Sequence, residues 1–232
     1  MVAILSTRDN GHPAMTGVLP NKADQAFLQI ERLIVLQELP PGSLVSEKQL
    51  MELTGLGRTP VREALQRLAR ERLVEIHANR GVLVAAASIE AQLKLLELRR
   101  TLEPFAVRLA AQRANADQRR TAATLAEEVL GATASVDDFA TFLRDAHALV
   151  VSATHNEFVE VAMAPLQGLS RRFWFGNLTD PHQDLAQAGE LHAAILAAIA
   201  AGDAEAAEAA SLALSDYLLA FAYATLPPQT RD

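Results

Sequence analysis

Apolar residues recur at intervals of three and four over most of the chain, the spacing of amphipathic helices. The segment 23–36 has this spacing and predicts a first helix. Ser46 with Gln49 three residues later has the form of a capping box and predicts the start of a short second helix. Thr59 followed by Pro60 predicts the start of a third, with the hydroxyl as cap and proline at the first helical position.

The period changes after the third helix. Two runs with β-branched residues, 73–77 and 82–85, flank a short segment that ends in Gly81, which predicts a strand pair joined by a turn. Helix, helix, turn, helix and hairpin together predict a winged helix-turn-helix domain over residues 21–86. Residues 1–20 have no apolar period, and we expect them to form a flexible tail.

The remainder of the chain, 87–232, has helical spacing throughout. Its breaks predict helices at roughly 88–114, 117–130, 136–153, 156–177, 183–201 and 203–225. The predicted fold class is therefore mainly α, with an N-terminal winged helix-turn-helix followed by an all-α bundle.

Charge is distributed unevenly between these two parts. The formal net charge of the 232 residues is -7, yet residues 21–88 carry nine Lys and Arg against eight Asp and Glu. Residues 89–232 carry eleven against nineteen. Within 58–80 there are six Arg and three Glu, so positive charge is concentrated on the third predicted helix and the hairpin. This concentration points to an anionic partner for the winged domain, and its weak net charge implies that useful affinity depends on dimer formation.

Several function classes are excluded or disfavoured by what the sequence lacks. It has no cysteine, so any metal must be held by His, Asp or Glu. It has no serine nucleophile motif, no phosphate-cradling glycine loop and no HExxH, so we do not expect an enzyme. The alternative is a metal-dependent hydrolase or oxygenase in the helical bundle with an accessory winged domain. Without a long apolar segment or a signal-like start, we expect a cytoplasmic protein that does not contact the membrane.

The third predicted helix carries the candidate DNA-binding residues. Helix-turn-helix proteins place such a helix in the major groove of DNA. Arg58 and Arg62 are one turn apart, opposite the apolar stripe of the helix, so both should point outward. There an arginine can donate two hydrogen bonds to guanine.

Further residues are expected to support this contact. Thr59 and Gln66 supply neutral donors and acceptors, Lys48 can hold a phosphate, and Arg80 at the hairpin tip can reach the minor groove. Three other arginines are expected on the solvated surface or paired with neighbouring glutamates, namely Arg67, Arg70 and Arg72. A protein-binding role for the winged domain is a further alternative, which the outward arginines disfavour.

The segment PPGSLVSEKQLMELTGLGRTPVREALQRLARERLVEIHANRGVLVA, residues 40–85, closely resembles the DNA-binding domain of GntR-family bacterial transcription regulators. The segments ELRRTLEPFAVRLAA, HNEF and LHAAILAAIAAGDAEAA, at 97–111, 155–158 and 191–207, resemble the FCD ligand-binding domain of the FadR subfamily. The six helices make the bundle similar to the VanR-like branch.

The resemblance implies a homodimeric regulator, by expectation a repressor, on a pseudo-palindromic double-stranded DNA operator. It implies DNA contacts at Lys48, Arg58, Thr59, Arg62 and Arg80-Gly81, and a small carboxylate or sugar-acid effector in the helical domain. Position 72, commonly Gly in the family, is Arg72 here, and we expect this difference to matter little.

Two histidines, His147 and His192, lie on the apolar stripes of their predicted helices. The resemblance implies that one Asp and three His hold a divalent metal such as Zn, Ni or Mn, which in turn binds the effector. His147 and His192 match two of these positions, but Leu143 and Leu214 occupy the other two and offer no donor atom.

We therefore expect a metal-free pocket in which an organic acid is held by arginines and histidines. The candidates are Arg99, Arg100, His147, Arg171, Arg172 and His192. For each of the two arginine pairs we expect one side chain to point inward and one outward.

Overall fold

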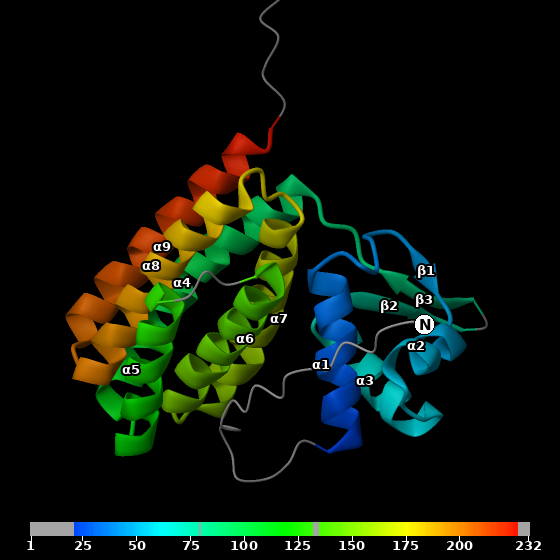
Figure 1. Ribbon diagram of the computed structural model, residues 1–232, viewed down its shortest axis with the longest axis horizontal. Helices are drawn as coiled ribbons and strands as arrows, with labels where there is room; N and C mark the ends of the chain where they lie inside the picture. Colours follow the sequence, from blue (N-terminus) through cyan, green and yellow to red (C-terminus); the bar gives the residue numbers. More distant parts are fainter. Residues whose placement is uncertain (1–20, 79, 132–134, 227–232) are drawn as a thin grey trace, which may run out of the picture.

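The computed structural model describes residues 21–78, 80–131 and 135–226, so the predicted tail 1–20 lies outside the described residues. An N-terminal winged domain lies beside a larger helical domain, and helix α1 (Lys22–Val35) of the winged domain packs against helix α7 (Glu157–Phe175) of the helical domain (Figure 1). Among the described helices, none has the length and apolar character needed to cross a membrane.

The winged domain has the predicted three helices and hairpin, with one further strand between the first two helices. After α1 come β1 (Leu44–Val45), α2 (Glu47–Thr54), α3 (Arg58–Arg70), β2 (Val74–His77) and β3 (Gly81–Val84). The three strands form an antiparallel sheet in the order β1-β3-β2. Strand β1 was not predicted, because two residues are too few to show an alternating pattern.

The helix starts of the winged domain agree only in part with the sequence. Ser46 and Gln49 form the predicted capping box at the start of α2. The predicted cap at Thr59 is wrong, because α3 already begins at Arg58 with Gly57 as its cap residue. Pro60 is tolerated there because the first four backbone N–H groups of a helix have no partner within the helix. Thr59 is consequently free to contact a ligand with its hydroxyl.

The helical domain contains the six predicted helices, each within a few residues of its expected bounds. They are α4 (Ile89–Arg113), α5 (Ala116–Gly131), α6 (Val136–Ala153), α7, α8 (Pro181–Ala201) and α9 (Ala204–Ala224). Their shared core includes Phe139, Leu149, Leu196 and Leu214, all fully buried. This core surrounds the positions at which the candidate effector residues lie.

Candidate DNA-binding surface and effector pocket

The recognition helix α3 buries one face and exposes arginines on the other. Val61, Leu65 and Leu68 are buried in the winged domain. The side chains of Arg58 and Arg62 are 73% and 62% exposed. Both arginines therefore point outward from the start of α3, as the helical spacing predicted.

Glu47, which the sequence patterns did not indicate, forms ion pairs with both of these arginines. The Nε atoms of Arg58 and Arg62 lie 3.4 and 3.3 Å from the two carboxylate oxygens of Glu47, in the first turn of α2. Exposed ion pairs of this kind contribute little stability, so a nucleic acid can take the place of Glu47 at modest cost. Glu47 holds the two guanidinium groups together at the junction of α2 and α3.

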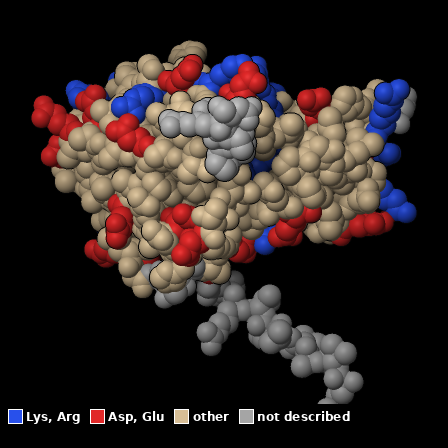
Figure 2. Space-filling model, turned by 90° about the horizontal axis from the view of Figure 1, so that it is seen from above, with Lys and Arg blue, Asp and Glu red and all other residues tan. Residues whose placement is uncertain are grey.

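Four of the other candidate DNA-binding residues are exposed as well. Lys48, Thr59, Gln66 and Arg80 all have exposed side chains. Helix α2 lies toward the side of the winged domain away from the helical domain, and α3 lies between α1 and α2 (Figure 1). Figure 2 shows Lys and Arg side chains at that end of the molecule, beside acidic ones. The arrangement offers a surface on which several basic groups can meet a duplex together.

Arg67, by contrast, makes contacts within the winged domain. It pairs with Glu71 at 3.3 Å, and its guanidinium lies 3.7 Å from the centre of the Phe27 ring on α1. It also approaches Asp24. This agrees with the expectation that Arg67 is a pairing residue and leaves it poorly placed to contact DNA.

Two positions depend on left-handed backbone geometry. Gly81 has φ +103°, and a Cβ atom there would lie 2.9 Å from the Val45 carbonyl oxygen. Gly81 is therefore required for the pairing of β1 with β3. Arg72 has φ +59° at the end of α3, a conformation that favours Gly. The expectation that Arg72 matters little was wrong with respect to backbone strain.

The helical domain contains a small cavity of about 20 Å³ between α4, α6, α7, α8 and α9. Four of the candidate effector residues line it, namely Arg99, His147, Arg171 and His192. Trp174 and Tyr217 close another side, and the Trp174 ring N–H donates to the Tyr217 hydroxyl at 3.1 Å. The structure thus brings together four candidate residues that are as much as 93 positions apart in the sequence.

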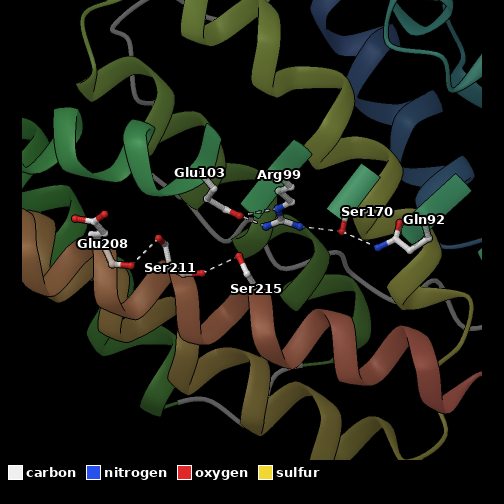
Figure 3. A network of polar contacts seen from close by, with 7 residues as sticks. All are labelled: Gln92, Arg99, Glu103, Ser170, Glu208, Ser211 and Ser215. Atoms are coloured by element: carbon white, nitrogen blue, oxygen red, sulfur yellow. Dashed lines mark hydrogen bonds and ion pairs between the residues drawn. The ribbon is translucent and has the colours of Figure 1, made fainter. Parts of the chain in front are cut away.

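Most donors of Arg99 are already used. Its Nε and one Nη donate to the two Glu103 carboxylate oxygens at 2.7 and 2.9 Å, and the other Nη donates to the Ser170 hydroxyl at 2.8 Å (Figure 3). Ser170 also accepts from Gln92 at 3.2 Å. The buried charge of Arg99 is thereby balanced, as buried charges require.

The two histidines lack most of their hydrogen-bond partners. Their ring centres are 5.7 Å apart. His192 Nδ1 lies 2.8 Å from the Ala188 carbonyl, to which it can only donate, while His192 Nε2 and both ring nitrogens of His147 have no partner among the residues that the structure describes. Buried polar groups without partners are costly and rare, which suggests that a ligand supplies them.

Burial keeps both histidines neutral. It lowers the pKa of His192 to about 4, an effect that the bond to the Ala188 carbonyl only partly offsets. Burial also lowers the pKa of His147 well below its usual value, and the charges of Arg99 and Arg171 add to this effect. Each neutral ring therefore carries one donor and one acceptor, and since His192 already donates to Ala188, His192 offers only the Nε2 acceptor.

Two predicted effector residues lie elsewhere. Arg100 is exposed and pairs with Asp216 on the surface, so the expectation of one inward and one outward arginine is confirmed for Arg99 and Arg100. For Arg171 and Arg172 it is wrong, because both are buried. The reason is that α7 is covered on one side by the bundle and on another by α1 and the segment after β3. Arg172 donates to the carbonyls of Ala85 and Ala86 at 2.8 and 2.7 Å and does not line the cavity.

The donor set does not fit the metal that the FCD family implies. His147 and His192 line the cavity, but the neighbouring positions are Leu143 and Leu214. Across the described residues, no group of three or more His, Cys, Asp or Glu could hold a metal ion. Two imidazoles without a third donor do not complete the usual coordination of Zn, Ni or Mn.

The functional residues that sequence reasoning missed differ in how visible they were. Glu103 is four residues after Arg99 on one helix, a recognisable pairing distance. Glu31, which pairs with Arg171 at 2.5 Å, is a charged residue on the apolar stripe of α1, and this anomaly could have drawn attention to it. Ser170 and Tyr217 carry no comparable signal.

A winged helix-turn-helix joined to a helical ligand-binding domain is the architecture of a DNA-binding regulator. The family model described as "Bacterial regulatory proteins, gntR family" matches residues 22–84, and that of the FCD domain matches residues 94–216, more than half of the chain. The chain belongs to the GntR-family transcription regulators that carry an FCD effector-binding domain.

Individual relatives agree with this assignment. The chain is 42% identical over 74 residues to the Nta operon transcriptional regulator of Aminobacter aminovorans. The matched region covers 32% of this chain and 35% of that protein. It is 26% identical over 218 residues to the galactonate operon transcriptional repressor of Escherichia coli K12, covering 84% and 93%. The first match thus spans about a third of the relative's length.

Solved structures show the same fold. The structure of E. coli McbR/YncC superimposes with a TM-score of 0.72 at 19% identity, over 89% of this chain and 99% of that one. A putative GntR regulator from Rhodococcus gives a TM-score of 0.64 at 23% identity, over 89% and 99%. These two structures show a shared fold, while the relatives above are named as transcriptional regulators and give no support to the hydrolase or oxygenase alternative.

Proposed function

We propose that this regulator is a homodimeric repressor that binds a pseudo-palindromic operator. Its affinity for the operator changes when a small organic acid binds in the helical domain. The observation that carries the effector site is a set of buried polar atoms around one cavity that have no partner in the described part of the chain: both ring nitrogens of His147, Nε2 of His192 and Nε of Arg171. A ligand with acceptor and donor groups would satisfy all of them.

The chemistry of these atoms favours a hydroxylated carboxylate. Arg171 Nε is a charged donor suited to a carboxylate oxygen. The neutral histidines each offer a donor or an acceptor, which suits hydroxyl groups next to that carboxylate. A sugar acid combines these features, and the relative from E. coli is named for galactonate. We propose sugar acids and related hydroxy acids as the ligand class.

An apolar surface on α4 and α7 is the proposed dimer interface. Leu98 and Phe105, seven residues apart on α4, are about half exposed, and Phe158 and Val161 on α7 are each 76% exposed. These two helices pack against each other through the small core cluster that includes Ala106 and Val159. A second copy of the chain would cover this surface in a symmetric pair, which matches the symmetry of a palindromic operator.

The DNA-binding half of the proposal is tested by its salt dependence. Fluorescence anisotropy with labelled duplexes at several salt concentrations should give affinities that fall steeply with salt, since bound phosphates release counterions. Affinity for duplex DNA that does not change with salt would instead favour a protein-binding role for the winged domain.

Elemental analysis and native mass spectrometry of protein purified without a metal-affinity tag measure whether the protein binds a metal ion. We expect a dimer without a stoichiometric metal. One divalent ion per subunit, lost on changing His147 or His192, would overturn the metal-free pocket.

A further inference from the structure

Arg171 stands between two cavities. One is the small pocket of the helical domain, and the other is a cleft of about 670 Å³ between the helical domain and the winged domain. The winged domain contributes Glu31, Arg67 and Glu71 to this cleft. Arg171 and His147 line both cavities, so these two side chains form the wall between the pocket and the cleft.

The pocket has to expand before it can hold an organic acid. A volume of about 20 Å³ is little more than the space that one water molecule needs. Trp174 and Leu214 on its other sides are fixed in the main core. The arginine, with its long side chain and open cleft beyond, is the wall residue best able to move. Displacement of Arg171 toward the cleft would therefore make room for a ligand.

The partner of Arg171 belongs to the other domain. Its Nη2 donates to Glu31 Oε1 of α1 at 2.5 Å, and both side chains are buried. Its Nε has no partner within residues 21–78, 80–131 and 135–226, so the guanidinium can bind a further anionic group. The adjacent Arg172 binds the carbonyls of Ala85 and Ala86 in the segment that connects the domains. Helix α7 thus holds α1 and the connecting segment by two consecutive arginines.

The buried carboxylate of Glu31 depends on Arg171 to compensate its negative charge. Burial raises the pKa of Glu71, Arg67 counteracts this, and the nearby charge of Glu31 raises it further. Arg67 is already shared between Glu71 and Asp24. If Arg171 is withdrawn, Glu31 becomes a buried carboxylate beside another carboxylate, an arrangement that favours separation of α1 from α7.

We propose that the carboxylate of the effector replaces Glu31 as the partner of Arg171, so that effector binding and the α1–α7 contact exclude each other. This inference rests on the effector pocket of the proposed function and adds how that pocket acts on the winged domain. Release of Glu31 frees α1 to move, and with it α2 and α3, which carry the DNA-binding arginines. By linkage, the contact between the domains weakens effector binding to the same extent that the effector weakens the contact.

The test uses acetate, which carries only the group that the inference requires. Trp174 is the one tryptophan of the sequence and lines the pocket, so its fluorescence reports binding in the full-length protein. Glu31→Gln removes the competing charge and should tighten acetate binding by about 5-fold to 150-fold, the usual range for coupled sites. Glu31→Asp keeps the charge and should bind acetate less tightly than Glu31→Gln.

The matched control is Glu38→Gln, which removes an exposed carboxylate paired with Arg32 just after α1 and should bind acetate as the wild type does. Equal affinity of Glu31→Gln and the wild type, or no response in either, would overturn the inference. Hydrogen exchange gives a second measurement, in which Arg171→Gln should speed exchange in α1 and leave α9 unchanged, while unchanged exchange in α1 would contradict it. The proposed function is tested separately, by DNA binding, and a wild type that does not bind duplex DNA would contradict it.

Discussion

Lowering the pH should destabilise the helical domain through its buried histidines. The pKa of His192 is lowered from 6.5 to about 4 by burial. As the pH falls below 6.5, the unfolded chain takes up a proton that the folded chain accepts only near pH 4. The free energy of unfolding therefore decreases across this window, and its full value is present above it.

The size of the effect follows from the shift. One pKa unit corresponds to about 1.36 kcal/mol, so at pH 4.5 His192 alone should reduce the free energy of unfolding by roughly 2 kcal/mol relative to pH 7. His147, whose pKa is lowered in the same direction by burial, adds to the loss in the wild type. Urea unfolding followed by Trp174 fluorescence measures this free energy at both pH values.

The variant His192→Gln isolates the contribution of His192 to the pH dependence of the free energy of unfolding. It should lose roughly 2 kcal/mol less than the wild type between pH 7 and pH 4.5. His182→Gln, which replaces an exposed histidine on the same helix, should follow the wild type. An equal loss in His192→Gln and the wild type would refute the conclusion that His192 is buried and neutral.

Three further substitutions test other parts of the structure. Arg62→Ala should abolish specific operator binding, with roughly 1–3 kcal/mol lost per base pair read, while Arg70→Ala should bind nearly as before; anisotropy with operator and scrambled duplexes compares them. Gly81→Ala should destabilise the winged domain by at least about 1 kcal/mol because of the close Val45 oxygen and the positive φ, and an unchanged melting temperature would contradict this. Arg72→Gly should stabilise it by up to about 1 kcal/mol by relieving the left-handed residue, and lower stability in urea would count against the argument.

The fold was largely predictable because local patterns specify it. The capping box at Ser46 and the apolar stripes of the six bundle helices depend on residues a few positions apart. Strand β1 and the true start of α3 were missed, since β1 consists of two residues and α3 has no side-chain cap. Such features become visible only when the partner strand or the backbone is known.

The proposed effector pocket was predictable only in part. His147 and His192 were found because a histidine on an apolar stripe is unusual. The burial of both Arg171 and Arg172 was not, because it results from α1 packing on α7, a contact between segments about 140 residues apart. Helical periodicity describes one helix and contains no information about what covers it.

The central claim is that Arg58 and Arg62 at the start of α3 read DNA in an effector-responsive dimer. Selection of binding sites from random duplex DNA, with the wild type and Arg62→Ala in parallel, tests it most directly. The account predicts that the wild type enriches an inverted repeat and that Arg62→Ala does not. Failure of the wild type to enrich any sequence, or enrichment of the same repeat by Arg62→Ala, would contradict it.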